Sequence, residues 1–322
     1  MKLFKRTLLI LVLITLSACA VSPSASPAPL MSPLPEPTSS ATPPQVPAAA
    51  VTLQPTLQPT ADQSQNALQE LIKNSTFIAP NYNKSITLRD GKYEAGAGAD
   101  YLLVQILPPM ALGDLNGDGK DEAAVLLGEN GGGSGVFVSL IVLTFKNGTP
   151  IQSGSALIDD RPKIHALSIK NSQVILDAII HGPTDAMVNP TLPVTETYQI
   201  ISNTLVMTRF ASKTPDGHDR SINISSPASQ AGVKGSVKVQ GSMPIAPFEN
   251  NLSYRVYDTQ GKQVAKGPFP VKASKPGGKA TFDYTVKIPA LPTGTAIRLE
   301  LSETSAKDGS IMTLDSVNLL IN

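Results

Sequence analysis

Apolar and polar side chains alternate along the last hundred residues of the chain. The apolar positions recur at every second residue in five segments, and polar residues such as Lys238, Arg255 and Glu300 lie between them. A period of two is typical of strands that bury one face. About seven short strands at this spacing predict a β-sandwich over residues 222–322. The positions predicted to be buried are Val237, Val239, Leu252, Tyr254, Val256, Phe282, Tyr284, Val286, Ile288, Ile297, Leu299, Leu301, Val317, Leu319 and Ile321.

Residues 62–212 begin with a helical pattern and continue with short apolar runs that are separated by turn formers. This combination predicts an α+β domain that is dominated by antiparallel sheet. The apolar face of the helix, at 62–73, consists of Ala67, Leu68, Leu71 and Ile72. The expected strands are 85–89, 100–107, 123–127, 136–145, 164–170, 173–180, 195–201 and 205–209. The pairs typical of hairpin turns are Asp90-Gly91, Asn147-Gly148 and Asn171-Ser172.

Two segments lack any such periodicity. Residues 213–221 are polar and rich in turn formers, which predicts a linker between the two folded regions. Residues 19–61 are mainly Pro, Ser, Thr and Ala, and this composition buries too little apolar surface to fold. At about 3.1 Å per residue, a tether of roughly 40 residues reaches at most about 130 Å. We interpret it as a spacer that carries the folded regions away from a membrane; a neutral linker whose length has no role is the alternative.

The first eighteen residues have the pattern of a secretory signal. Lys2, Lys5 and Arg6 form a basic segment, and a mostly aliphatic run follows at 7–16. This run is shorter than the roughly 18 residues that a permanent membrane helix needs. Residues 16–19 read Leu-Ser-Ala-Cys, which resembles the lipobox of bacterial lipoproteins.

The lipobox resemblance implies that Cys19 becomes the new amino terminus and carries acyl chains. Two or more chains anchor a protein stably, whereas one chain binds membranes only marginally. We therefore expect a lipid-anchored protein on the extracytoplasmic face of a cell membrane. An ordinary secreted protein with an unrelated cysteine near its cleavage site is the alternative. Because Cys19 is the only cysteine, no disulfide can form within the chain.

Composition and charge narrow the class of partner. Loss of residues 1–18 changes the formal net charge from +1 to about −2. A chain so close to neutral gives no electrostatic reason to expect nucleic acid as a partner. Aromatic residues make up 5% and charged residues 16% of the chain, compared with about 25% charged residues in an average globular protein. This composition favours a β-rich exported protein.

Residues 114–122 carry the sharpest local motif, Asp-Leu-Asn-Gly-Asp-Gly-Lys-Asp-Glu. Oxygen side chains at loop positions 1, 3, 5 and 9, with a carbonyl at position 7, suit a hard cation such as Ca²⁺. The motif resembles the calcium loops of the integrin-like and dockerin-like families. Position 12 is Val125 where an EF-hand has a bidentate Glu, so we expect weak binding, with a dissociation constant of about 10⁻⁴ to 10⁻³ M. A polar turn without an ion is the alternative. The predicted ligands are Asp114, Asn116, Asp118, Lys120 and Glu122.

Other polar or glycine-rich segments give no complete catalytic or nucleotide site. The glycine-rich segment 128–135 lacks the Gly-Lys-Ser/Thr ending of a phosphate loop and precedes an apolar strand pattern. It predicts a loop between strands, with a ligand-contacting loop as the alternative and no nucleotide. We expect Asp159 and Asp160 to lie in a solvated turn, and spacing alone predicts no catalytic residue. The histidines, none of which belongs to a recognisable metal motif, are His165, His181 and His218.

Turn and core residues after position 221 resemble the immunoglobulin-like domain of bacterial spore germination proteins. They are 222–227, Gly241, 248–251, 254–258, 260–262, Gly267 and 305–310. The resemblance implies a fold more strongly than a function. The region before it is similar to an uncharacterised group of bacterial envelope lipoproteins that carry Gly-Asp-Leu-Asn-Gly-Asp-Gly and a later Gly-Gly-Ser-Gly.

Together these features predict a non-catalytic lipoprotein that serves as a binding or structural module of the bacterial envelope. The expected partners are the membrane, through the lipid anchor, and a cell-wall polymer or another envelope protein. Ca²⁺ is the expected cofactor, and a role in sporulation or germination follows from the resemblance alone. The alternative is an envelope hydrolase or hydrolase inhibitor with its site in 62–212. A pocket that gathers His165 or His181 with Asp159 or Asp160 favours the enzyme.

Overall fold

The computed structural model describes residues 61–322. The predicted signal peptide, Cys19 and the tether up to residue 60 lie outside the described residues, so the predictions about them stay predictions. The described part forms one compact unit with one α-helix and four sheets. Within residues 61–322, no helix is long and apolar enough to cross a bilayer.

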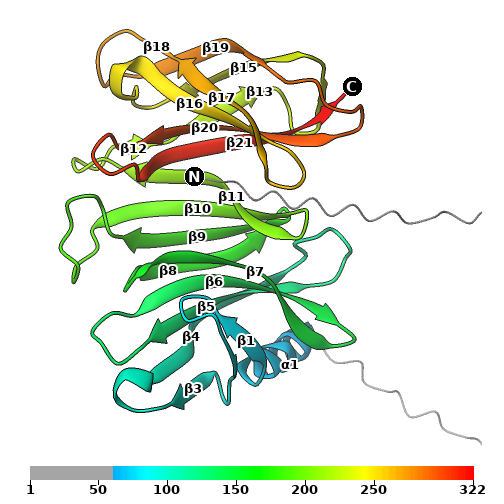
Figure 1. Cartoon of the computed structure of the whole chain (residues 1–322), viewed down its shortest axis with the longest axis vertical. Coiled ribbons are helices and arrows are strands. Elements are labelled where there is room, and N and C mark those ends of the chain that lie inside the picture. The colour runs from blue at the N-terminus through cyan, green and yellow to red at the C-terminus, as the bar shows by residue number, and fades with distance from the viewer. Residues whose placement is uncertain (1–60) are drawn as a thin grey trace, which may run out of the picture. The chain divides into compact units, whose positions relative to one another are not determined.

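A five-stranded antiparallel meander forms the centre of the N-terminal region (Figure 1). The two middle strands bury most of their side chains because both faces of this sheet are covered. A 3₁₀ turn at Gly98–Asp100 precedes the second strand. The strands, in spatial order, are β3 (Lys92–Ala95), β4 (Leu102–Gly113), β5 (Glu122–Asn130), β6 (Phe137–Lys146) and β7 (Thr149–Asp160).

The helix and a hairpin cover one face of the meander. α1 (Ala61–Lys73) leads into the hairpin of β1 (Thr76–Ala79) and β2 (Lys84–Thr87). Ile72 of the helix and Phe77 of the hairpin are buried in one core with Val125 and Ile141 of the meander. Each such side chain contributes roughly 1.5–3 kcal/mol when fully buried.

The opposite face of the meander packs on a second sheet. Leu126 and Leu140 of the meander share a core with Leu176 and Tyr198 of that sheet. Alternate residues of β5 therefore serve two different cores. The second sheet runs in the order β8 (Lys163–Lys170), β9 (Gln173–Ile180), β10 (Leu192–Ile201), β11 (Thr204–Lys213), β21 (Ile311–Ile321), β20 (Ala296–Thr304), β16 (Asn251–Tyr257) and β17 (Gln263–Pro270), read here from one edge to the other.

A third sheet completes a sandwich in the C-terminal region. Its core includes Phe269 and Phe282, whose rings meet edge to face with centroids 5.4 Å apart. β14 (Ala231–Val233) pairs in parallel with β21, and a 3₁₀ turn at Phe248–Asn250 precedes β16. The third sheet consists of β13 (Asn223–Ser226), β15 (Ser236–Met243), β19 (Ala280–Lys287) and β18 (Lys272–Ala273).

The pairing of β11 with β21 joins the two regions into a continuous sheet. Phe210 lies opposite Leu314, and both side chains belong to the core beneath the meander. The Thr313 and Ser316 hydroxyls donate to backbone carbonyls of β11, at 3.0 and 2.9 Å. The segment predicted as a linker contains β12 (Asp219–Arg220), which also pairs with β11. The boundary at 213–221 stays a prediction, and the sheet runs across it.

The predicted fold class is confirmed, because the described residues are mainly β with one short helix and several antiparallel sheets. The predicted turn pairs adopt positive φ, for example Asn147 at 52° and Gly148 at 76°. The hydrophobic pattern misses β7, whose Pro150 and Gly154 interrupt the alternation and whose pairing with β6 contains two irregularities.

Four predicted positions differ from the structure. In α1, Leu68 is partly buried and Ile72 is fully buried, while Ala67 and Leu71 are exposed. Residues four apart lie on the same face of a helix, and only the face with Leu68 and Ile72 contacts the meander. Tyr284 is 36% exposed, although its ring meets Phe269 edge to face. Glu300, expected on a polar face, is buried, because the two neighbouring guanidinium groups of Arg255 and Arg298 pair with it.

Candidate functional site

The loop between β4 and β5 is held together by its own side chains. The two carboxylate oxygens of Asp114 accept the N–H groups of Gly117 at 2.6 Å and Gly119 at 2.9 Å. Asn116 Oδ1 accepts the N–H of Asp118 at 2.8 Å. Such side-chain to backbone bonds favour tight turns.

Glu122 closes the same loop from the first position of β5. One of its carboxylate oxygens accepts the N–H groups of Leu115 and Asn116, at 2.9 and 3.1 Å. The other accepts the Asn116 side-chain amide at 2.8 Å. Burial raises the pKa of Glu122, although the two backbone N–H groups oppose this shift. Glu122 thus anchors the loop to the meander.

The predicted calcium ligands have chemistry that suits the ion. Asp114, Asn116, Asp118 and Glu122 supply the hard oxygens that Ca²⁺ prefers. Lys120 donates its N–H to Asp118 Oδ1 at 2.9 Å. Within residues 61–322, no three His, Cys, Asp or Glu side chains form a group that suits a metal ion. The described geometry is a turn closed by hydrogen bonds, and calcium binding stays a prediction.

The glycine-rich segment forms a fastened loop between β5 and β6. Asn130 donates its side-chain amide to the carbonyls of Gly133 and Gly135, at 2.8 and 2.5 Å. A Cβ atom on Gly131 would lie 2.3 Å from the Tyr82 hydroxyl, so a larger residue there would displace the end of that side chain, and Gly132 has a φ of 88° that favours glycine. The loop between strands is confirmed, and its glycines serve packing and turning.

The acidic pair at the end of β7 is not a solvated turn. Asp160 is buried and pairs with Arg161 at 2.6 Å. Burial alone would raise the pKa of Asp160, but the Arg161 guanidinium and the Val136 N–H outweigh it and lower the pKa. Asp159 pairs with His181, with 2.8 Å between Oδ2 and Nδ1. The expectation of solvation is wrong because β7 extends through both residues.

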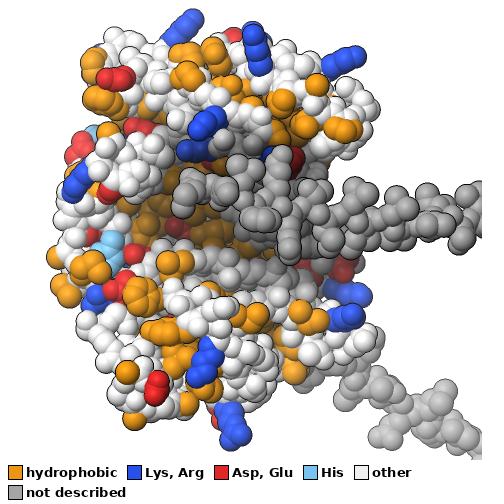
Figure 2. Space-filling view, in the orientation of Figure 1, with side chains coloured by type: hydrophobic (Ala, Val, Ile, Leu, Met, Phe, Trp, Pro, Cys, Tyr) orange, Lys and Arg blue, Asp and Glu red, His pale blue; other side chains and the backbone are white. Residues whose placement is uncertain are grey.

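His181 lies at a cavity of about 890 Å³. The cavity is walled by the 181–185, 213–217 and 308–312 segments, and Figure 2 shows a hollow with hydrophobic side chains on this side of the molecule. Its apolar lining includes Phe210 and Met312. Nε2 of His181 is buried and has no hydrogen-bond partner within residues 61–322. His165 lines a different cavity of about 500 Å³, and His218 is exposed beside Asp216.

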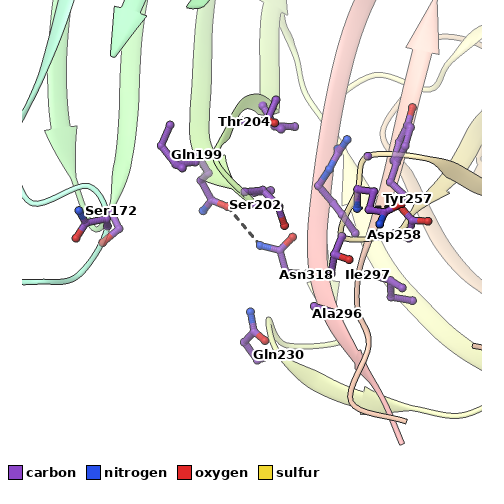
Figure 3. A pocket seen from close by; sticks show the side chains of 18 of the residues that line it. Ser172, Gln199, Ser202, Thr204, Gln230, Tyr257, Asp258, Ala296, Ile297 and Asn318 are labelled. Atoms are coloured by element: carbon purple, nitrogen blue, oxygen red, sulfur yellow. Dashed lines mark hydrogen bonds between the residues drawn. The ribbon is translucent and has the colours of Figure 1, made fainter. Parts of the chain in front are cut away.

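A second cavity, which we call the junction cleft, has a volume of about 510 Å³. One wall consists of the β10–β11 hairpin, the β8–β9 turn and residues 115–116 of the motif loop. The other consists of the β16–β17 turn, the start of β20 and Asn318 of β21. Figure 3 shows Gln199, Ser202, Gln230 and Asn318 around its open middle, with Ser172 on one side and Tyr257 on the other.

Amides and a stacked cation dominate the polar chemistry of the junction cleft. Asn318 donates its side-chain amide to Gln199 Oε1 at 3.3 Å, across the line where β11 meets β21. The Arg298 guanidinium lies 4.5 Å above the Tyr257 ring and donates to Glu300 at 2.7 Å. Burial, followed by the charge of Glu300, raises the pKa of Tyr257. These contacts hold both walls in place.

The sequence motifs do not reveal the junction cleft. Leu115 and Asn116 line its edge, and they belong to the motif at 114–122, so one sequence motif lies near the cleft. Gln199, Gln230 and Asn318 belong to no motif and lie far apart in the sequence. The pairing of β11 with β21 brings Gln199 to Asn318. Gln230 lies beside Asn318 because its backbone N–H donates to the Asn318 carbonyl at 2.7 Å.

Comparison with protein families identifies the C-terminal region. Residues 221–310 match the family model Gmad2, which is described as an immunoglobulin-like domain of bacterial spore germination. Residues 221–310 form a Gmad2 domain. The resemblance expected for this region is therefore confirmed, and Tyr257 and Arg298 of the junction cleft belong to the Gmad2 domain. Comparison with curated proteins gives no significant match.

Proposed function

We propose that this protein is a non-catalytic binding protein of the bacterial envelope, anchored through acylated Cys19, and that it binds its partner at the junction cleft. The observation that carries the proposal is the composition of the cleft, since the N-terminal region and the C-terminal region, most of which matches Gmad2, supply one wall each. Ligand pockets occur preferentially where two structural regions meet and carry a few convergent polar groups. The partner is a cell-wall polymer or an envelope protein.

The Gmad2 match supports a germination-related role for the C-terminal module. We extend this proposal to the whole protein, which would act in germination at the extracytoplasmic face of the cell membrane. Calcium bound at Asp114, Asn116, Asp118, Lys120 and Glu122 would stabilise the motif loop. Since Asn116 lines the junction cleft, that loop would then support the binding wall.

A pull-down from envelope extract tests the binding role. The bait is the full chain, used with and without millimolar calcium. Ser202→Arg places a long cation at the exposed rim of the junction cleft and should reduce recovery of the partner. Ser274→Arg, at an exposed residue outside the cleft, should leave recovery unchanged. If neither condition retains a partner and the purified chain hydrolyses wall fragments, the binding role is wrong.

A hydrolase is the second candidate, because Asp159 pairs with His181, and His181 lines a cavity. When Nδ1 donates to Asp159, Nε2 is left as a proton acceptor, as in a general base that a carboxylate orients. Its partner would be a water molecule that attacks a substrate bond. Under this hypothesis His181→Ala abolishes hydrolysis of wall fragments, while His218→Ala, at an exposed histidine, preserves it. Equal rates in both variants would remove this candidate.

A further inference from the structure

The charged groups that line the junction cleft do not favour an anionic ligand. The cation of the cleft, Arg298, is paired with Glu300, and Asp258 accepts the N–H groups of Gln260 and Lys262 at 2.9 Å each. An anionic ligand would find no unpaired cation on these groups, and the carboxylate of Asp258 would repel it. Charged groups in a pocket discriminate strongly in favour of the opposite charge. The lining therefore favours a neutral ligand over a phosphate or nucleotide.

Amide groups are left available for such a ligand. No hydrogen bond within residues 61–322 uses Nε2 of Gln199 or the side chain of Gln230. Each side-chain amide offers two N–H donors and one carbonyl acceptor. Ser172 and Ser202, at the tips of two adjacent hairpins, add hydroxyl groups at the rim. This set of donors and acceptors matches a ligand that presents hydroxyl and acetamido groups close together.

A flat surface accompanies these polar groups. The Arg298 guanidinium stacked on Tyr257 is planar and is held by its bond to Glu300. Aliphatic parts of Ile200 and Val206 also line the cleft. Aromatic and guanidinium planes present an apolar face beside polar edges. The C–H face of a pyranose ring has the same combination, because its hydroxyl groups project around an apolar face.

We propose that the junction cleft binds a neutral saccharide, with wall glycan built from N-acetylated amino sugars as the ligand class. This inference rests on the proposed binding function and names its ligand. A peptide is the competing ligand. The lining favours the saccharide because amides and hydroxyls surround the open middle of the cleft (Figure 3).

Titration of the full chain with defined oligosaccharides tests the proposal. The probe is a β-1,4-linked tetramer of N-acetylglucosamine, and the matched probe is cellotetraose, which lacks the acetamido groups. We expect wild type to bind the tetramer, and cellotetraose more weakly. Gln199→Ala and Asn318→Ala should each weaken binding by about three- to tenfold, the effect of losing one neutral hydrogen bond. The control is Gln240→Ala, because the Gln240 side chain donates to Asp283 within the third sheet, outside the cleft. This variant should bind like wild type.

The controls separate this proposal from the broader one. Thermal melts of each variant show whether it folds, and a double variant at Gln230 and Ser172 avoids the interaction between Gln199 and Asn318. No binding of the tetramer, or equal binding by all variants, overturns the saccharide site. Binding of a short neutral wall peptide in its place overturns the ligand class. If the pull-down retains a protein while no saccharide binds, only the ligand class fails, and the binding function stands.

Discussion

Glu196 is a buried carboxyl in the core beneath the meander. Its Oε2 accepts the Tyr198 hydroxyl at 2.8 Å. Burial raises the pKa of Glu196 to about 7, and the charge of Asp159 adds to this shift, while the Tyr198 hydrogen bond opposes it. Burial likewise raises the pKa of Tyr198. The folded protein therefore holds a proton on Glu196 that the unfolded chain, with a carboxyl pKa near 4.5, releases earlier.

This proton makes stability depend on pH. The contribution of neutral Glu196 is complete below about pH 4.5 and is lost as pH rises through about 7. The expected loss is about 3 kcal/mol in the free energy of unfolding. Glu196→Gln should remove most of this slope when urea unfolding is measured at pH 5 and pH 8. Glu70→Gln, at an exposed helix residue, should keep it. An unchanged slope in Glu196→Gln would assign the pH dependence to other groups.

Asp114 is the residue through which calcium binding is best tested. Asp114→Ala removes acceptors for two backbone N–H groups and one predicted ligand. For a dissociation constant near 10⁻³ M, about 10 mM calcium stabilises wild type by about 1 kcal/mol. We expect calcium to raise the melting temperature of wild type but not of Asp114→Ala. Asp121→Ala, in the same loop but outside the predicted ligand set, should respond like wild type. If calcium leaves the wild-type melting temperature unchanged, the prediction of calcium binding at this loop is contradicted.

At the scale of elements, alternation predicts strands well where each strand faces one core. Val237 and Val239 of β15 are both buried as expected. The strand β7 escapes prediction because Pro150 and Gly154 break its alternation, and its partner β6 supplies the apolar surface. Glu300 is buried although alternation places it on the polar face of its strand, because two arginines pair with it. The junction cleft could not be predicted, since it depends on a pairing between residues about a hundred positions apart, Phe210 and Leu314.

Because β11 pairs with β21, we expect the N-terminal and C-terminal regions to unfold together. Phe210 is 4% exposed and lies in the core under the meander while pairing with β21, the last strand of the C-terminal region. Phe210→Ala should lower the free energy of unfolding by about 3–5 kcal/mol. Because one sheet spans both regions, we expect wild-type chemical denaturation to show one transition. Phe248→Ala, at a side chain that is 77% exposed, should change stability little. Two separate wild-type transitions would show that the regions unfold independently.

At the scale of the whole molecule, we propose that Cys19 determines where the folded unit works. Cys19→Ala removes the proposed acyl acceptor, and without acyl chains we expect the protein to leave the membrane fraction. Fractionation followed by mass measurement of the mature chain checks both location and modification. Ser24→Ala, in the same tether, should stay with the membrane. A Cys19→Ala protein that remains there in wild-type amount rules out the lipid anchor.

The pairing between β11 and β21 also covers a strand edge on each side. If the chain is divided between residues 213 and 222 and the two fragments are isolated, β11 and β21 lose each other as partners. Each strand then has unpaired N–H and C=O groups along one edge. Exposed edges of this kind recruit strands from other molecules. An isolated C-terminal fragment of residues 222–322 is therefore expected to self-associate through β21. A dimer of such a fragment would form because β11 is absent, so it would say nothing about the oligomeric state of the intact chain.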